Sequence, residues 1–168
     1  MEHGSLVPSA WVDRWAPLVT QGTVLDVACG AGRHARLFRQ RGLEVVAVDR
    51  DSQDISGVRF VQADLEDGSP WPFPGERFNA VVVTNYLYRP LMSQLRDSLA
   101  DGGVLIYETF MLGNERFGKP SNPAFLLRPG ELLECFKDLA VKGFEEGEVS
   151  LPKPAMIQRL CAVRTGKG

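Results

Sequence analysis

Short apolar runs recur along the chain, and between several of them the apolar residues follow a helical spacing. The run over residues 24–28 is almost continuous, as in a strand that is buried on both faces of a parallel sheet. Similar runs over 45–48, 58–61, 80–84 and 104–107 predict four further strands. Strands that alternate with helical patterns or loops indicate an α/β domain with a mostly parallel sheet.

Helical spacing of apolar residues predicts helices at four places. These helices carry Trp11, Trp15 and Leu18 near the N-terminus, Ala31, Ala35 and Phe38 after the first strand, Leu91, Leu95 and Leu99 before the fifth strand, and Leu132, Leu133 and Phe136 after it. The first belongs to a helical extension over residues 1–20, and the third ends at Gly102-Gly103. Residues 142–149 and 156–164 are typical of a final antiparallel pair of strands.

Three connections depart from a regular alternation of strands and helices. Only residues 50–57 separate the second and third strands, and parallel strands normally need a crossover of about a dozen residues or more. We therefore expect a turn or an irregular loop there. Residues 66–77 are rich in Gly and Pro, which favours a loop. Residues 110–128 form a connection long enough to be a lid loop.

The stretch from Asp26 to Gly32 carries the strongest chemical signal of the chain. Glycines between a strand and a helix, here Gly30 and Gly32, let the backbone approach a ligand, and a helix start offers unpaired N–H groups. Asp26 lies inside the strand, where an unpaired carboxylate is costly to bury. Asp49 and Asp64 follow the next two strands, and an acid about 20 residues beyond such a turn accepts hydrogen bonds from ribose hydroxyls. Three carboxylates at successive strand ends predict one ligand crevice.

With these residues the chain resembles the class I S-adenosylmethionine-dependent methyltransferases over roughly residues 10 to 164. The resemblance rests on Asp26 to Gly32 as the first motif, Asp49 as the ribose acid, Asp64-Leu65 at the adenine site, and residues 71–80 as the run into the fourth strand. It implies one Rossmann-like domain over residues 1–168, with a seven-stranded, mostly parallel sheet, helices on both faces and an antiparallel C-terminal strand. It also implies S-adenosylmethionine as the cofactor, with S-adenosylhomocysteine as the product, and no metal.

Within that family the chain is most similar to the small tellurite-resistance-type methyltransferases. The similarity lies in Cys29-Gly-Ala-Gly-Arg33, in the block from Phe125 to Leu132 and in the lack of an added domain, whereas residues 80–92 depart from that type. It implies a small, polarisable or anionic methyl acceptor, such as an oxyanion or a thiol.

Further candidate cofactor contacts lie beside these motifs. Cys29 supplies a small side chain in the glycine turn, and Leu65 belongs to the adenine site. Arg50 or Ile55 covers the adenine side, where the expected helix is missing. Asn85 follows the fourth strand, where the family places residues that line the transferred methyl.

Three residues are candidates for the acceptor side of the site. Tyr86 orients the acceptor, contacts a sulfonium through its ring, or simply packs. Glu108 ends the predicted fifth strand and is a base or a helix cap, and a base matters only if the acceptor arrives protonated. Arg159, like Arg116 and Arg128, has the forked guanidinium that suits an oxyanion or carboxylate, unless it is a solvated surface residue.

The charges and the cysteines argue against a nucleic-acid-binding, zinc-binding or disulfide-bonded protein. The chain has 19 basic and 21 acidic residues, and a net charge of −2 argues against nucleic acid as a partner. Cys29, Cys135 and Cys161 show no C-x-x-C spacing, which favours reduced thiols over zinc or disulfides. His34, on the second predicted helix, is expected to pack rather than to catalyse. The chain shows no signal peptide and no apolar run near about 18 residues, so we expect a cytoplasmic protein without a membrane partner.

We therefore predict a methyltransferase that acts on a small molecule, and the sequence leaves its oligomeric state open. A nicotinamide-dependent oxidoreductase also fits Gly30-x-Gly32-x-x-Ala35, although Asp26 inside the strand disfavours it. A non-catalytic relative would bind the cofactor or a partner without transferring methyl. A methyltransferase of RNA or protein would dock through the basic cluster Arg33, Arg36, Arg39 and Arg41.

Overall fold

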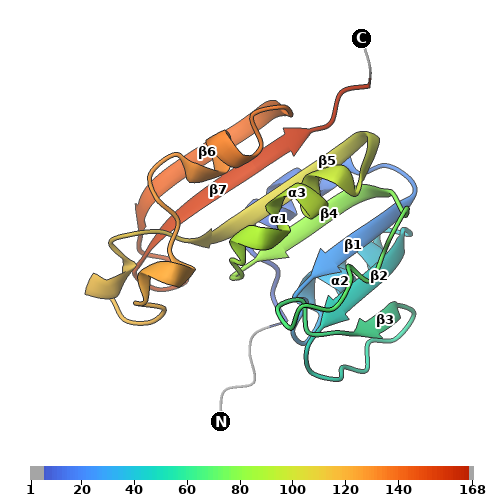
Figure 1. Ribbon diagram of the computed structural model, residues 1–168, viewed down its shortest axis with the longest axis horizontal. Helices are drawn as coiled ribbons and strands as arrows, with labels where there is room; N and C mark the ends of the chain where they lie inside the picture. Colours follow the sequence, from blue (N-terminus) through green and yellow to red (C-terminus); the bar gives the residue numbers. More distant parts are fainter. Residues whose placement is uncertain (1–5, 167–168) are drawn as a thin grey trace.

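The computed structural model of the protein describes residues 6–166 and places seven strands in one sheet flanked by short helices (Figure 1). The strands are β1 (Thr23–Val27), β2 (Glu44–Asp49), β3 (Arg59–Gln62), β4 (Phe78–Thr84), β5 (Leu99–Phe110), β6 (Ala140–Val149) and β7 (Ala155–Val163). The α-helices are α1 (Ala10–Trp15), α2 (Arg33–Gln40), α3 (Met92–Asp97) and α4 (Glu131–Cys135). Single 3-10 turns are η1 (Ala16–Leu18), η2 (Arg89–Leu91), η3 (Asn114–Arg116) and η4 (Pro123–Phe125).

The sheet has the strand order β3-β2-β1-β4-β5-β7-β6. Strands β1 to β5 pair in parallel, β7 is antiparallel to β5, and β6 is antiparallel to β7. The order reverses between β1 and β4, and ligands of such sheets bind at the carboxyl ends of the strands beside this switch point. The predicted Rossmann-like, mostly parallel sheet with its antiparallel C-terminal strands is confirmed.

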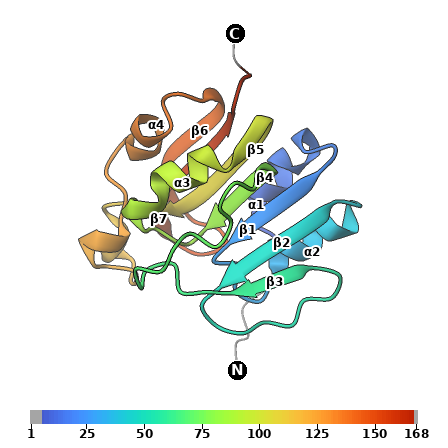
Figure 2. The same ribbon diagram turned by 45° about the vertical axis from the view of Figure 1, so that its right-hand side comes forward.

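Helices cover both faces of the sheet, as predicted (Figure 2). Helices α1 and α2 pack on one face, and α3 and α4 pack on the other. In β1, Leu25 and Val27 join the core below α3 and α4, whereas Val24 joins the core below α1 and α2. Asp26 comes two residues after Val24 and therefore points to the side of α2. No helix in the described part of the chain is both long and apolar enough to cross a membrane.

The two short connections are irregular, as the sequence predicts, and loop side chains fill part of the core. Phe73, from the 66–77 loop, is buried against the α3 face of the sheet. Its ring makes edge-to-face contacts with Trp71 and Phe78, at centroid distances of 5.4 and 5.7 Å. Such pairs add to the stabilisation that burial of the rings provides.

Strand β5 is longer than the sequence pattern suggests. The predicted helix through Leu99 to Gly102-Gly103 is wrong at its end, because α3 stops at Asp97 and Leu99 already pairs with Phe78. The glycines lie in an irregular part of β5, where the register shifts. A Cβ on Gly103 would lie 2.9 Å from the carbonyl oxygen of Phe78, so a larger residue does not fit. These glycines permit a close strand contact rather than a helix end.

The N-terminal segment joins the fold through α1. Ser9 caps this helix, because its hydroxyl accepts a hydrogen bond from the Val12 N–H at 3.0 Å. Trp11 is buried, and its indole N–H donates to the carbonyl oxygen of Leu160 in β7 at 3.1 Å. The predicted extension over residues 1–20 is thus helical from Ala10 to Leu18, while its first five residues lie outside the described part.

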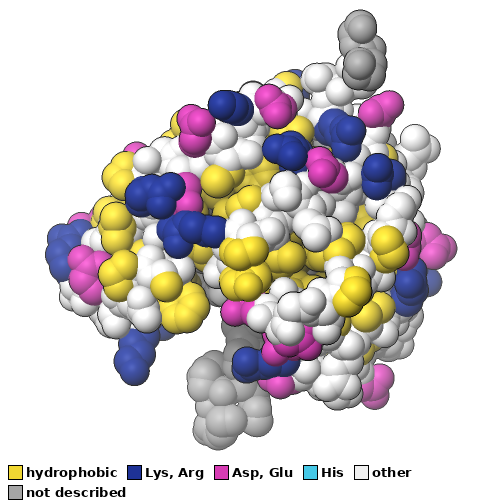
Figure 3. Space-filling model, in the orientation of Figure 1, with side chains coloured by type: hydrophobic (Ala, Val, Ile, Leu, Met, Phe, Trp, Pro, Cys, Tyr) yellow, Lys and Arg dark blue, Asp and Glu magenta, His cyan; other side chains and the backbone are white. Residues whose placement is uncertain are grey.

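The 110–128 connection forms a lobe beside the carboxyl end of β5 (Figure 1). Met111 and Leu127 close its base as a parallel bridge, and the Leu112 N–H donates to the Leu127 carbonyl at 2.9 Å. The lobe surface mixes basic and apolar side chains (Figure 3). Closure of this lobe over a site stays a prediction.

We predict that Phe73→Ala lowers the free energy of unfolding by about 3 kcal/mol or more, because it removes a buried ring from a packed cluster. Phe125→Ala, which removes a ring that is 50% exposed, is the matched control and should change stability by no more than about 0.5 kcal/mol. Urea denaturation followed by circular dichroism measures both. Equal small losses in the two variants would show that the 66–77 loop does not belong to the core.

Candidate functional site

The carboxyl ends of β1, β2 and β3 bring the three predicted acids to one edge of the sheet. Asp26 pairs with Ala47 near the end of β1, and Asp49 ends β2 opposite Gln62. Asp64 follows Gln62 by two residues. The acids therefore end three adjacent strands, as the sequence predicts, and the charge of Asp49 acts on Asp26.

The glycine turn after β1 is tied to the end of β2 through Asp49. The Gly30 N–H donates to Asp49 Oδ1 at 3.0 Å, and the Asp51 N–H donates to Oδ2 at 3.0 Å. Gly30 and Gly32 have φ angles of +55° and +88°, which glycine adopts without strain. Ala28 also has a positive φ, +55°, and such residues cluster at functional sites.

The connection between β2 and β3 covers this turn with one apolar side chain. Ile55 is buried, and a Cβ on Gly32 would lie 2.6 Å from its Cδ1 atom. Arg50, the other predicted cover of the adenine side, is exposed, and its side chain forms a long ion pair with Asp51, at 3.9 Å. The compact turn therefore depends on both Gly32 and Ile55.

Asp26 is the most strongly perturbed carboxylate at this edge. It is 2% exposed, and its Oδ2 atom is buried without a hydrogen-bond partner among residues 6–166. Burial raises the pKa of Asp26 to about 7, against the opposing effects of the Ala35 backbone N–H and the Arg33 charge. A buried acceptor without a donor is costly in a folded protein and fits a ligand that brings an N–H or O–H group.

Cys29 lies in the same turn and is buried. Burial, with the nearby charges of Asp26 and Asp49, raises the pKa of its thiol to about 12. The thiol is therefore protonated at neutral pH and is a poor nucleophile. This environment supports the prediction that Cys29 supplies bulk rather than chemistry.

The segments after β3 and β4 meet across the ends of β2 and β1. The Tyr86 hydroxyl donates to Glu66 Oε2 at 2.9 Å, and Asp64 Oδ1 accepts from the Glu66 N–H at 2.9 Å. Leu65 packs partly into the core beside them, and Asn85 precedes Tyr86 with a φ of +54°. Burial and the contact with Glu66 raise the pKa of Tyr86, so its hydroxyl remains a donor. The hydrogen bond between Tyr86 and Glu66 thus joins the segment predicted to bind adenine to the segment predicted to line the methyl group.

His34, in the first turn of α2, lies beside the end of β4. Its Nε2 accepts a hydrogen bond from the Ser9 N–H at 3.0 Å, and its Nδ1 lies 3.5 Å from the Thr84 hydroxyl at the end of β4. Nε2 is an acceptor, so the ring is neutral with its proton on Nδ1. Burial, together with the charge of Arg33, lowers the pKa of His34 to about 3. His34 therefore packs, and it links the N-terminal segment to the sheet edge.

Glu108 and Arg159 form one ion pair between β5 and β7. Arg159 Nε lies 2.5 Å from Glu108 Oε2, and its Nη1 lies 2.9 Å from Glu145 Oε1. Their Cα positions are partners in the antiparallel ladder. Glu108 lies within β5, two residues before its end, rather than at the end.

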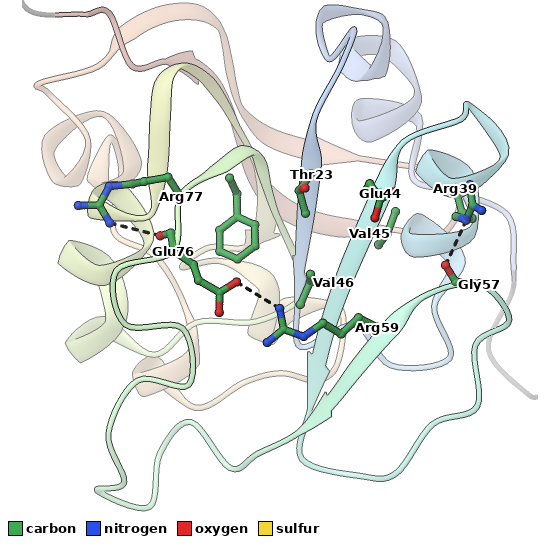
Figure 4. A pocket seen from close by; sticks show the side chains of 10 residues that line it. Thr23, Arg39, Glu44, Val45, Val46, Gly57, Arg59, Glu76 and Arg77 are labelled. Atoms are coloured by element: carbon green, nitrogen blue, oxygen red, sulfur yellow. Dashed lines mark hydrogen bonds and ion pairs between the residues drawn. The ribbon is translucent and has the colours of Figure 1, made fainter.

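A cavity of about 260 Å³ lies at the opposite, amino-terminal edge of the sheet (Figure 4). Thr23, Glu44 and Arg59, which begin β1, β2 and β3, lie on its wall. Arg59 is paired with Glu76 at 3.2 Å, and Arg39 donates to the Gly57 carbonyl at 3.1 Å. This cavity is remote from Asp26 and the glycine turn, so it belongs to a different part of the molecule.

Comparison with known proteins decides the family. A family profile described as a methyltransferase domain matches residues 2–132, which is most of the chain. The chain belongs to the methyltransferase-domain family. This result confirms the predicted family, and it favours S-adenosylmethionine over the nicotinamide cofactor as the ligand of the glycine turn.

Solved structures share the fold of this methyltransferase domain. TehB from Haemophilus influenzae is 17% identical, with a TM-score of 0.74 over 95% of this chain and 63% of that one. A 1,6-didemethyltoxoflavin-N1-methyltransferase from Burkholderia thailandensis, solved with bound 1,6-didemethyltoxoflavin and S-adenosylhomocysteine, is 19% identical, with a TM-score of 0.68 over 96% of this chain and 79% of that one.

Curated relatives include a tRNA U34 carboxymethyltransferase from Shewanella piezotolerans. It is 29% identical over 157 residues, which cover 74% of this chain and 47% of the relative. The methyltransferase domain thus spans about half the length of the curated relatives that it matches.

Sequence reasoning missed the partners that hold the site together. Glu66 is close to Asp64 in sequence, but nothing in its spacing points to Tyr86, 20 residues away. Arg89 binds Glu131 with two hydrogen bonds, of 2.7 and 3.0 Å, across 42 residues. Such contacts depend on how loops fold back over the sheet, and local pattern carries no signal for them.

We predict that His34 makes the stability of the protein depend on pH. The unfolded histidine takes up a proton below pH about 6.5, whereas the buried ring resists protonation down to about 3. The contribution of the neutral His34 ring to the free energy of unfolding is therefore complete above pH about 6.5. It is lost as the pH falls below that value. Between pH about 7.5 and about 5.5, the wild type should lose about 1.4 kcal/mol more than His34→Gln, which keeps neutral polar atoms. Parallel stability curves for the two proteins would contradict the buried, neutral histidine.

Proposed function

We propose that this methyltransferase domain transfers the methyl group of S-adenosylmethionine to a small-molecule acceptor. The observation that carries the proposal is the group of carboxylates around the glycine turn, with the unpartnered Oδ2 atom of buried Asp26 among them. Such a group calls for a ligand that brings several hydrogen-bond donors, as a ribose and an ammonium group do.

The residues at the sheet edge fit a nucleoside with an amino-acid tail. Asp49 keeps free lone pairs on both carboxylate oxygens after its two backbone contacts, so it can accept from ribose hydroxyls. Asp26 Oδ2 accepts from the ammonium of the tail. Asp64, which is polar, and Leu65, which is apolar, flank the adenine ring of the cofactor. When bound, the cofactor supplies a methyl group that is already activated by a sulfonium, so the chain mainly binds and aligns.

Tyr86, Glu108 and Arg159 form the acceptor side in this proposal. Tyr86 positions the acceptor through its ring and its hydroxyl, which Glu66 orients. Glu108 is held by Arg159, so the position of its carboxylate is fixed. An acceptor that arrives with a lone pair, such as a thiolate or an oxyanion, needs no base at all.

The arginines along α2 donate hydrogen bonds to backbone carbonyls, which favours a small-molecule acceptor over RNA. Arg33 donates to the Val7 carbonyl, Arg36 to the Ala31 carbonyl and Arg39 to the Gly57 carbonyl. Guanidinium groups that serve backbone carbonyls are less free for a phosphate backbone. A structural neighbour that is named for a small-molecule substrate supports the same choice.

Transfer to tRNA is the second candidate, because curated relatives are named as tRNA carboxymethyltransferases. A labelled methyl donor offered with thiols, oxyanions, amines and total tRNA separates the two candidates. We expect label in a small molecule, at a rate that depends little on salt. Label in tRNA, with binding that weakens steeply as salt rises, would favour the second candidate. Cofactor binding without label in any acceptor would favour a non-catalytic relative.

We predict that Asp49→Asn weakens S-adenosylhomocysteine binding by about tenfold or more, since hydrogen bonds to a charged acceptor contribute about 1.5 to 3 kcal/mol. Glu44→Gln, at the other end of the same strand and exposed, is the control and should bind like the wild type. Isothermal titration calorimetry measures both. Unchanged affinity in Asp49→Asn, or no binding by the wild type, would contradict the proposed site.

We also predict that cofactor affinity depends on the protonation of Asp26. Its carboxyl has a pKa of about 7, so a growing fraction is neutral as the pH falls below that value. S-adenosylhomocysteine binding should then weaken by up to about tenfold per pH unit below about 7 and level off above it. Asp26→Asn, titrated in the same way, should bind weakly and show a flatter profile. A wild-type profile that is flat from pH about 5.5 to 8 would rule out a contact with ionised Asp26.

A further inference from the structure

A second cavity lies at the carboxyl edge of the sheet, where the 110–128 lobe meets the start of β7. It has a volume of about 330 Å³. Its wall consists of Phe110, Asn114, Arg116, Phe117, Lys119, Lys153, Pro154 and Ala155. Three of these residues are cations and none is acidic, so the wall is electropositive.

The cations of this cavity are largely unpaired. Lys119 and Lys153 form no ion pair within residues 6–166. Arg116 is 3.9 Å from Glu148 and donates to the Gly113 carbonyl at 3.2 Å. This state differs from that of the amino-edge cavity, where Arg59 is paired with Glu76 (Figure 4). Three positive charges that share a hollow, two of them without an acidic partner in the described part of the chain, favour an anion.

The buried side-chain amide of Asn114 holds together the two segments beside the cavity. Asn114 is 2% exposed, its amide N–H donates to the Pro120 carbonyl at 2.9 Å, and its Oδ1 accepts from the Met156 N–H at 3.0 Å. These bonds hold the 114–120 segment against the start of β7. Lys119 belongs to the first of these segments and Lys153 lies two residues before β7, so both lysines adjoin backbone that these bonds hold before any ligand binds.

Apolar side chains also line the cationic cavity. Phe110 and Phe117 lie on its wall, Phe117 is 36% exposed, and the Arg116 guanidinium lies 5.0 Å from the centre of the Phe117 ring. The left-hand lobe in Figure 3 shows yellow and dark blue side chains, with magenta ones at its edge. A ligand with both an anionic group and an apolar body matches such a surface.

The position of the cavity sets a length for its ligand. Phe110 lies two residues beyond Glu108, which pairs with Thr84 of the neighbouring strand β4. With about 3.3 Å per residue and about 4.8 Å between strands, the Cα atom of Phe110 on the cavity wall lies roughly 8 Å from that of Thr84, the residue before Asn85 and Tyr86. A bare oxyanion is too short to occupy both places.

We propose that this cavity binds the anionic end of an extended acceptor, a small molecule that carries a phosphate, sulfate or carboxylate at one end and the methyl-accepting atom at the other. The inference rests on the proposed function for the identity of the ligand as an acceptor. Lys119 and Lys153 contact the anion, Arg116 adds charge, and Phe117 packs on the apolar body. A phosphate of an RNA strand could bind the same cations, and the test below distinguishes RNA from a small molecule.

The test measures binding of naphthyl phosphate and of uncharged naphthol by the full chain, by calorimetry without cofactor. The wild type should bind naphthyl phosphate more tightly than naphthol. In Lys119→Gln/Lys153→Gln, naphthyl phosphate should bind about tenfold more weakly, because charged hydrogen bonds are lost, and naphthol should bind as before. Lys142→Gln, an exposed lysine on β6 away from the cavity, is the control and should match the wild type.

Three results would overturn the proposal. They are equal binding of naphthyl phosphate and naphthol, unchanged binding in the double lysine variant whose melting temperature matches the wild type, and preferential binding of a single-stranded RNA oligonucleotide through the same lysines. S-adenosylhomocysteine is titrated into the same proteins, and its affinity should be equal in all of them. Failure of that titration in the wild type would reject the proposed cofactor site, while the naphthyl phosphate result still decides the anion site.

Discussion

The hydrogen bonds from the Gly30 and Asp51 N–H groups to the Asp49 carboxylate determine how the ligand edge of this methyltransferase domain is built. The Gly30 bond joins the turn after β1 to the end of β2, and the local Asp51 bond holds the same carboxylate, whose negative charge acts on buried Asp26. Burial is the main cause of the raised pKa of Asp26, and the like charge of Asp49 adds to it. The edge is therefore prepared for a ligand that carries hydrogen-bond donors and positive charge.

The fold keeps this edge in place with few helices. The connection over residues 50–57 has no helix, and Ile55 instead packs on Gly32, while Phe73 from another loop fills the opposite face. On the α2 side, His34 joins Ser9 to Thr84, and on the other side Tyr86 joins Glu66. Loops and single side chains thus pack at the places where helices would otherwise cover the sheet. The geometry of the site therefore depends on individual contacts.

The sequence predicted the strands and the acids at their ends because both depend on local pattern. A buried strand needs an apolar run, and a strand-to-helix turn needs glycine, as at Gly30 and Gly32. It mispredicted the end of the third helix, because Gly102-Gly103 is compatible with a helix end or with a tight strand contact, and only the approach of Phe78 separates them. The pairing of Glu108 with Arg159 and the cavity at Lys119 and Lys153 arise from contacts between distant segments.

The central claim is that one ligand occupies the carboxyl ends of β1, β2 and β3. Amide NMR spectra recorded during titration with S-adenosylhomocysteine test it most directly. We expect the largest shifts at the amides of Gly30, Gly32, Arg50 and Leu65, with little change at Thr23 and Glu44 at the other end of the same strands. Shifts confined to the amino-edge cavity, or no shifts at saturating ligand, would contradict the account.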